Sequence, residues 1–94
     1  MPQSPLGPAE RKALKARAHK LDPVVTIGAK GLTEEVVKEV DLALKAHELI
    51  KVRAPAIERV DREEAMRTLC ERTQAEAVQT IGKVFVLYRK RDDK

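Results

Sequence analysis

The sequence predicts an α/β fold with α+β character, in which three helices pack with a four-stranded mixed sheet in one compact domain. Its 94 residues suffice for one hydrophobic core and leave no room for a second domain. Apolar residues change between helical spacing and strand alternation, in the order helix, strand, helix, strand, helix, strand, strand. We place the domain at residues 8–90, between a proline-rich flexible tail of residues 1–7 and a polar tail of residues 91–94.

The first helix is expected from Pro8 to about Lys20, because proline suits the first turn of a helix. One stripe of this helix is apolar and the adjacent stripe is cationic. The apolar stripe holds Leu14, Ala18 and Leu21, and the cationic stripe holds Arg11, Lys12, Lys15 and His19. Asp22-Pro23 then forces extended backbone, so residues 24–27 are predicted to form a short buried strand.

The second helix is predicted from Thr33, as N-cap, to Ala46 or His47. Leu32 and Val37 have the spacing of a hydrophobic staple, whereas Leu42 lies off the apolar stripe and is either partly exposed or covered by something else. A strand over residues 49–54 follows, and its polar face is basic. That face carries Lys51 and Arg53.

A third helix and a hairpin complete the chain. Asp61 and Glu64 have the spacing of a capping box for a helix ending near Arg72. Its stripe contains Ala65, Met66, Leu69, Cys70 and Thr73. Strands over 75–81 and 84–89 are joined by a type II′ turn at Gly82-Lys83, which places Glu76 opposite Arg89. Strands connected through helices should run parallel, and the hairpin adds an antiparallel strand.

A G-x-x-G loop, Gly28-Ala29-Lys30-Gly31, joins the first strand to the second helix. Glycine at both ends lets the backbone adopt positive φ and approach a ligand, so that N–H groups can face phosphate oxygens. Lys30 adds a mobile positive charge at the tip. The same pair of glycines also suits a purely structural turn, and both interpretations stay open.

Charge is segregated along the chain, although the net charge is only +4. Residues 9–31 hold six basic and two acidic residues, whereas residues 32–49 hold two basic and five acidic ones. The basic end includes the G-x-x-G loop. Such segregation is what a polyanion-binding face requires.

Four separated motifs resemble the CRM domain (chloroplast RNA splicing and ribosome maturation), and the bacterial single-domain YhbY-type members above all. They are residues 18–25 (AHKLDPVV), 27–33 (IGAKGLT), 47–52 (HELIKV) and 81–83 (IGK) followed by 86–89 (VLYR). The resemblance covers nearly everything from Pro8 to Arg89. It implies an RNA-binding fold similar to the C-terminal domain of translation initiation factor 3, with a loop like that of KH domains. It further implies association with precursors of the large ribosomal subunit.

The expected function is therefore that of an rRNA-binding assembly factor that catalyses no reaction and acts as a monomer. The expected RNA-binding residues are Gly28, Ala29, Lys30, Gly31, Arg11, Lys12, Lys15, Lys51 and Arg53. Glu34 and Glu35 would repel a phosphate on the helix terminus, so contact is expected through loop N–H groups and Lys30. The alternatives are a protein-interaction adaptor, whose basic surface meets an acidic partner and for which Leu42 is a candidate anchor, and a small RNA-modifying enzyme.

Little in the sequence favours catalysis, a metal or a cofactor. Gly28 to Thr33 does not supply a Walker A loop, and one cysteine with two histidines offers no closed zinc set. Cys70 lies in an apolar stripe, and surface or capping roles are favoured for His19 and His47. A single cysteine allows no internal disulfide, and neither a signal peptide nor a membrane span is apparent, so a reducing cytoplasm is expected.

Phe85 and Tyr88 are the only aromatic residues and are predicted to lie on opposite faces of one strand. An aromatic base-stacking platform is therefore not expected.

Overall fold

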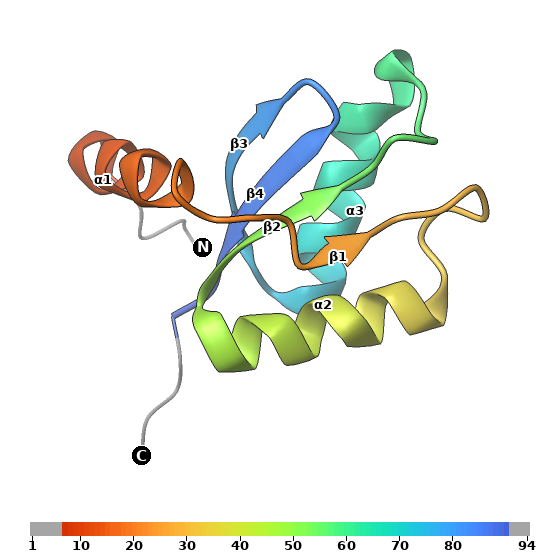
Figure 1. The fold of residues 1–94 in the computed structure, drawn as a ribbon, viewed down its shortest axis with the longest axis horizontal. Coiled ribbons are helices and arrows are strands. Elements are labelled where there is room, and N and C mark those ends of the chain that lie inside the picture. The colour runs from red at the N-terminus through yellow and green to blue at the C-terminus, as the bar shows by residue number, and fades with distance from the viewer. Residues whose placement is uncertain (1–6, 91–94) are drawn as a thin grey trace.

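The computed structural model describes residues 7–90 (Figure 1). The elements are α1 (Pro8–Ala18), β1 (Val25–Thr26), α2 (Glu34–His47), β2 (Leu49–Arg53), a short 3-10 helix η1 (Arg59–Asp61), α3 (Arg62–Thr73), β3 (Glu76–Ile81) and β4 (Val84–Tyr88). This order confirms the predicted one, with η1 added. The tails expected over residues 1–7 and 91–94 lie, apart from Gly7, outside the described residues.

The four strands form one mixed sheet in the order β1-β2-β4-β3. β1 runs parallel to β2, as the helical connection between them requires. β4 runs antiparallel to both β2 and β3, so it lies between them in the sheet. The three strands that follow helices therefore all run in one direction, as predicted, and the last strand fills the gap.

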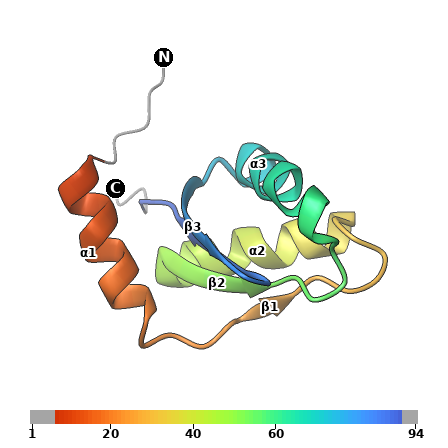
Figure 2. The same ribbon diagram turned by 90° about the horizontal axis from the view of Figure 1, so that it is seen from above.

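Helices cover both faces of the sheet (Figure 2). α2 and α3 pack on one face, over a core that includes Ile27, Val52, Leu69 and Phe85. α1 packs on the other face at one end, over a smaller cluster of Leu14, Ala18, Leu49, Val78 and Val86. Phe85 belongs to the first cluster and Tyr88 packs against the second, which confirms that the two rings lie on opposite faces.

α1 is shorter than predicted and ends at Ala18. The Leu21 N–H donates to the Ala18 carbonyl at 3.0 Å, so the chain turns tightly before the extended Asp22-Pro23 segment. Leu21 consequently leaves the apolar stripe and is 36% exposed. The first strand was also predicted too long, because Val24 is 51% exposed and only Val25 and Ile27 point into the core.

α2 begins and ends where the sequence predicted. The Thr33 hydroxyl oxygen accepts from the Val36 N–H at 3.2 Å, which confirms Thr33 as N-cap. Leu32 and Val37 both pack against the core, and Leu42 is 63% exposed. Of the two alternatives for Leu42, the structure therefore shows exposure.

The capping box predicted for the third helix is wrong. Asp61 has helical φ and ψ of −99° and −5°, and its side chain makes no cap hydrogen bond. A capping side chain needs an extended backbone at its own residue, whereas Asp61 is the last residue of η1. The predicted apolar stripe is confirmed, because Met66, Leu69, Cys70 and Thr73 are all buried.

The hairpin turn is confirmed, but the predicted strand register is not. Gly82 has φ +55° whereas Lys83 does not have positive φ, as a type II′ turn requires. A bulge between Ala77 and Gln79 then shifts the pairing by one residue, so Glu76 lies opposite Tyr88. Arg89 instead forms an ion pair with Asp41 at 2.8 Å.

Within residues 7–90, no helix is long and apolar enough to cross a membrane. The same residues contain no group of three or more His, Cys, Asp or Glu side chains arranged to hold a metal ion.

Candidate functional site

The G-x-x-G loop is an exposed turn at the end of β1. The Gly31 N–H donates to the Gly28 carbonyl at 3.0 Å and closes the turn, and Ala29 and Lys30 form its tip. Only Gly31, at φ +77°, uses the left-handed conformation, so the expectation of positive φ at both glycines is wrong for Gly28. Glycine freedom is required at the second position alone.

The tip of the loop can receive a ligand. In the described part of the chain, the N–H groups of Ala29 and Lys30 have no hydrogen-bond acceptor. A Cβ atom added at Gly28 or Gly31 would meet nothing within 4 Å, so the space around the loop is open. Two adjacent N–H groups beside a lysine can bind one phosphate oxygen pair.

The N-terminus of α2, directly after the loop, is already occupied by protein groups. Thr33 caps the Val36 N–H, and the Glu34 carboxylate forms an ion pair with Arg72 at 2.9 Å. Arg72 reduces the negative potential of this first turn, although Glu35 stays exposed. An anion at this end of the molecule would therefore meet the loop tip and not the helix axis.

β2 places two of the predicted cationic residues on the sheet face that α1 only partly covers. Leu49 is buried beneath α1, and strand alternation puts Lys51 and Arg53 on that same face. Arg53 lies opposite Thr26, and its carbonyl accepts from the Ile27 N–H at 2.7 Å. Arg53 therefore lies next to the start of the G-x-x-G loop.

The three cationic residues predicted on α1 do not have equivalent environments. Lys12 is exposed, whereas Arg11 and Lys15 are half-buried because they flank the packing face that carries Leu14 and Ala18. The Arg11 guanidinium donates to the backbone carbonyls of residues 77 and 78, at the bulge in β3. Arg11 therefore holds α1 on the edge of the sheet, whereas the Lys12 and Lys15 side chains make no hydrogen bond or ion pair within residues 7–90 and are the stronger candidates for ligand contact.

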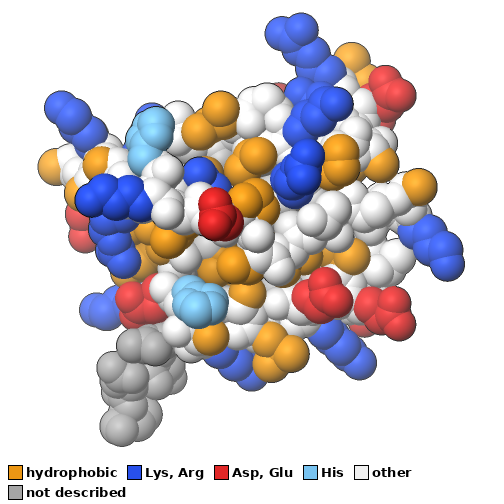
Figure 3. Space-filling view, in the orientation of Figure 1, with side chains coloured by type: hydrophobic (Ala, Val, Ile, Leu, Met, Phe, Trp, Pro, Cys, Tyr) orange, Lys and Arg blue, Asp and Glu red, His pale blue; other side chains and the backbone are white. Residues whose placement is uncertain are grey.

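The structure arranges the remaining predicted residues as a band and not as one cluster. α1 and the loop lie at opposite ends of the molecule, with β1 and β2 between them (Figure 1). We call the set Lys12, Lys15, Lys51, Arg53 and Lys30 the cationic band. Figure 3 shows Lys and Arg side chains at both ends of this face, whereas acidic side chains gather where α2 begins.

Cys70 is not a candidate nucleophile at neutral pH. Its side chain is buried in the core, and this burial raises the pKa of the thiol to about 11. The thiol is therefore protonated and screened from solvent. The prediction that Cys70 serves in core packing is confirmed.

The sequence analysis missed a cavity of about 330 Å³ beside α1. Two of the residues that line it, Leu21 and Val24, were predicted to be buried. Their exposure next to Asp22 depends on where α1 ends, which the apolar spacing did not show.

The fold places an open G-x-x-G loop beside a sheet face that carries Lys51 and Arg53, an arrangement that favours contact with a polyanion. Residues 6–89 match the model of the CRS1 / YhbY (CRM) domain. The chain belongs to this family.

Relatives and a solved structure agree with this assignment. The chain is 43% identical over 84 residues to a protein of Haemophilus influenzae named RNA-binding protein, covering 89% of this chain and 85% of the relative. It is 42% identical over 81 residues to a protein of Pseudomonas aeruginosa named probable RNA-binding protein, covering 86% and 78%. The solution structure of a hypothetical protein from Staphylococcus aureus superposes with a TM-score of 0.83 at 36% identity, covering 94% of this chain and 92% of that one.

Proposed function

We propose that this protein binds RNA and acts, in the cytoplasm and without catalysing a reaction, on precursors of the large ribosomal subunit. The observation that carries the proposal is the G-x-x-G loop, which starts next to Arg53 and carries at its tip Lys30 and two N–H groups that have no acceptor within residues 7–90. Membership of the CRM family supports RNA as the ligand. The ribosomal target follows from what the family resemblance implies.

Contact with the sugar-phosphate backbone is the mode of binding that the surface favours. Phe85 is buried in the core and Tyr88 is half-buried against α1, so the sheet presents no aromatic platform. The cationic band offers up to five lysine and arginine side chains for phosphate contact. Affinity should therefore fall steeply with salt, with a logarithmic slope of about −0.7 to −0.9 for each phosphate engaged.

Charge reversal at the loop tests the proposal directly. Lys30→Glu changes an exposed tip residue that makes no hydrogen bond to the described chain, so the melting temperature should stay unchanged. Lys38→Glu is the matched control, because Lys38 is also exposed but lies on α2, across the sheet from α1. Fluorescence anisotropy with a labelled rRNA fragment, titrated at several salt concentrations, gives the affinity and the salt slope of each variant.

The expected result is a loss of affinity for Lys30→Glu of about tenfold, with a salt slope shallower by about one contact. For Lys38→Glu, the decrease in the logarithm of the affinity should be less than half of that for Lys30→Glu, because Lys38→Glu changes only the net charge. Equal losses for both variants would show that the loop is merely a turn. Lys12 and Lys15 would then be the better candidates.

The ribosomal target needs a separate experiment in cells. In a sucrose gradient at low magnesium, the protein should sediment with large-subunit precursors more than with polysomes, and ribonuclease treatment should release it. Even distribution through polysomes would contradict the assembly role while leaving RNA binding intact.

One observation favours a second candidate function, that of a protein-interaction adaptor. Leu42 is 63% exposed and borders a groove with Val37 and Arg72 on the side of the sheet away from α1. An adaptor would keep its association with ribosomal particles after ribonuclease treatment and would lose it on Leu42→Asp. The same gradient therefore separates the two candidates.

A further inference from the structure

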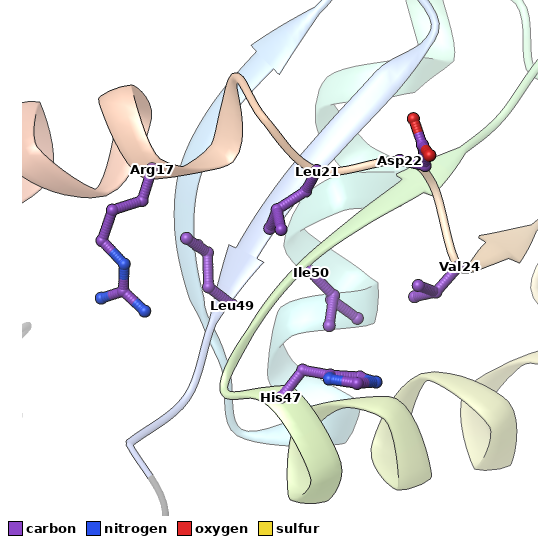
Figure 4. Close-up of a pocket in the computed structure, with 7 residues that line it drawn as sticks. All are labelled: Arg17, Leu21, Asp22, Val24, His47, Leu49 and Ile50. Atoms are coloured by element: carbon purple, nitrogen blue, oxygen red, sulfur yellow. The ribbon is translucent and has the colours of Figure 1, made fainter.

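A cavity of about 330 Å³ opens between the end of α1, the end of α2 and the start of β2 (Figure 4). Its floor is made by the buried side chains of Leu49 and Ile50. Leu21 and Val24 form apolar walls that stay exposed to solvent at 36% and 51%. The volume is at the lower end of the range of about 300 to 1,000 Å³ seen for ligand pockets, so it suits one small flat molecule.

Three polar side chains stand around this apolar cavity: Arg17, Asp22 and His47. Figure 4 shows them on separate sides of the opening, with Asp22 and His47 on opposite sides of the apolar floor and the Asp22 carboxylate pointing away from His47. All three are exposed, and none of them forms a side-chain hydrogen bond or an ion pair with another described residue. The fold therefore makes no use of their polar atoms.

We infer that this cavity binds one unstacked base of the RNA, with guanine preferred. The inference rests on the proposed RNA binding and adds base recognition to it. The cavity borders the cationic band at β2, since Leu49 and Lys51 are two residues apart and lie on the same face of that strand. An RNA strand held along the band by its phosphates would pass the opening.

The chemistry of the rim explains the preference for guanine. A carboxylate only accepts hydrogen bonds, so Asp22 matches an edge that presents donors. The Watson–Crick edge of guanine places two N–H donors side by side, on N1 and on the 2-amino group. Adenine, cytosine and uracil each place an acceptor beside their donor, and that acceptor would face the carboxylate.

The other rim groups suit the rest of a nucleotide. Guanidinium and imidazole planes stack on bases, and both groups bind phosphate when charged. Arg17 and His47 thus replace the aromatic rings that this sheet lacks. Leu21 and Val24 would become buried against the base, which favours binding by removing apolar surface from water.

Short synthetic RNAs test the inference. The probes are fluorescein-labelled decamers of uridine with one central guanosine, inosine or adenosine, measured by anisotropy at low salt. Inosine lacks only the 2-amino group of guanosine, so it reports on one of the two predicted hydrogen bonds. The wild-type protein should bind the guanosine decamer about five- to tenfold more tightly than the others.

Two variants assign this preference to the cavity. Asp22→Asn should bind all three decamers alike, because the amide presents a donor to the guanine edge. Glu39→Gln is the control, because it removes one negative charge from an exposed position of α2 outside the cavity. It should keep the full preference for guanosine. In the wild-type protein, the methyl resonances of Leu21 and Val24 should shift more with the guanosine decamer than with the adenosine decamer at equal RNA concentration.

Each outcome decides one question. Equal wild-type affinity for the three decamers, with a steep salt dependence, would overturn the base pocket and leave RNA binding standing. A guanosine preference that survives Asp22→Asn would also overturn the inference. Absence of binding to these decamers and to the rRNA fragment would overturn the proposed function itself.

Discussion

Replacing Arg11 by methionine tests whether this residue stabilises the fold or contacts a ligand. Arg11 donates to the carbonyls of Ala77 and Val78, and these bonds connect α1 to the edge strand β3 across 66 residues of sequence. Methionine keeps the aliphatic stem of the side chain and removes only the guanidinium. The neighbouring Lys12 is exposed and makes no hydrogen bond within residues 7–90, so Lys12→Met is the matched variant.

The expected cost can be estimated from these two bonds. A hydrogen bond from a charged donor contributes about 1.5 to 3 kcal/mol when buried. The bond to Ala77 is exposed, and the bond to Val78 is 3.5 Å long, so both lie below that range. We expect Arg11→Met to lower the free energy of unfolding by about 1 to 1.5 kcal/mol, and Lys12→Met to change it by less than about 0.5 kcal/mol.

Urea unfolding and salt-dependent RNA titration measure the two effects separately. Arg11→Met should shift the urea midpoint and leave the salt slope of RNA binding unchanged at temperatures where the variant is folded. Lys12→Met should leave the urea midpoint unchanged and make the salt slope of RNA binding shallower by about one phosphate contact. A stable Arg11→Met protein with a flattened slope would refute the structural role of Arg11 and return it to the RNA-binding residues.

Three further predictions concern stability. The hydrogen bond from Arg89 lowers the pKa of Asp41 more than any other contact does. The Asp41–Arg89 pair therefore stabilises the fold at neutral pH, and this stabilisation is lost as the pH falls through the lowered pKa of Asp41. Arg89→Ala, which also removes a 2.7 Å bond to the Thr73 carbonyl, should cost about 2 kcal/mol in urea unfolding at pH 7 and less once the pH is below the lowered pKa of Asp41; an equal cost under both conditions would contradict this. The pKa of Cys70 is raised from 9.0 to about 11, so the free energy of unfolding should fall as the pH rises through this window, and Cys70→Ala should abolish that slope. Gln74 is the C-cap of α3 and has φ +58°, so Gln74→Gly should relieve backbone strain and raise the free energy of unfolding by about 0.5 to 1 kcal/mol. A lower melting temperature for this variant would contradict the prediction and show that the entropy of glycine outweighs the relieved strain.

Elements whose ends are marked by local signals were predictable from the sequence. α2 begins after Thr33 because a threonine hydroxyl caps the first turn, and this depends only on residues three positions apart. The turn at Gly82 depends on the backbone freedom of a single residue. Periodicity predicted the core stripe of α3 for the same reason, since it records which side of one helix is apolar.

Features that depend on contacts between distant segments were not predictable in this way. The bulge in β3 buries Val78 under α1 while Arg11 binds the carbonyls beside it, so the register of the hairpin is fixed by a helix at the other end of the chain. A regular two-residue hairpin would have placed Glu76 opposite Arg89. Arg89 instead donates hydrogen bonds to the Asp41 carboxylate on α2 and to the Thr73 carbonyl at the end of α3.

The candidate site shows the same division. The G-x-x-G loop is contiguous in sequence, so its composition alone indicated a glycine-dependent turn, and ligand contact at this turn stays a prediction. The stripe of Arg11, Lys12 and Lys15 correctly indicated a cationic side of α1, but spacing cannot show which of these side chains the sheet requires. That distinction needs the position of β3.

The early end of α1 connects the fold to the inferred base pocket. Three further helical residues would have carried Leu21 onto the apolar stripe with Leu14 and Ala18, where it would be buried. Asp22-Pro23 prevents this, because the residue before a proline is restricted to extended backbone and the helix must end upstream. The chain therefore crosses to β1 with Leu21 and Val24 exposed on either side of a carboxylate. Exposed apolar walls weaken a domain of this size, and a ligand that covers them restores the lost burial only while it is bound. The exposed Leu21–Val24 segment therefore lowers the stability of the free protein, and the same exposure provides the surface to which a base can bind.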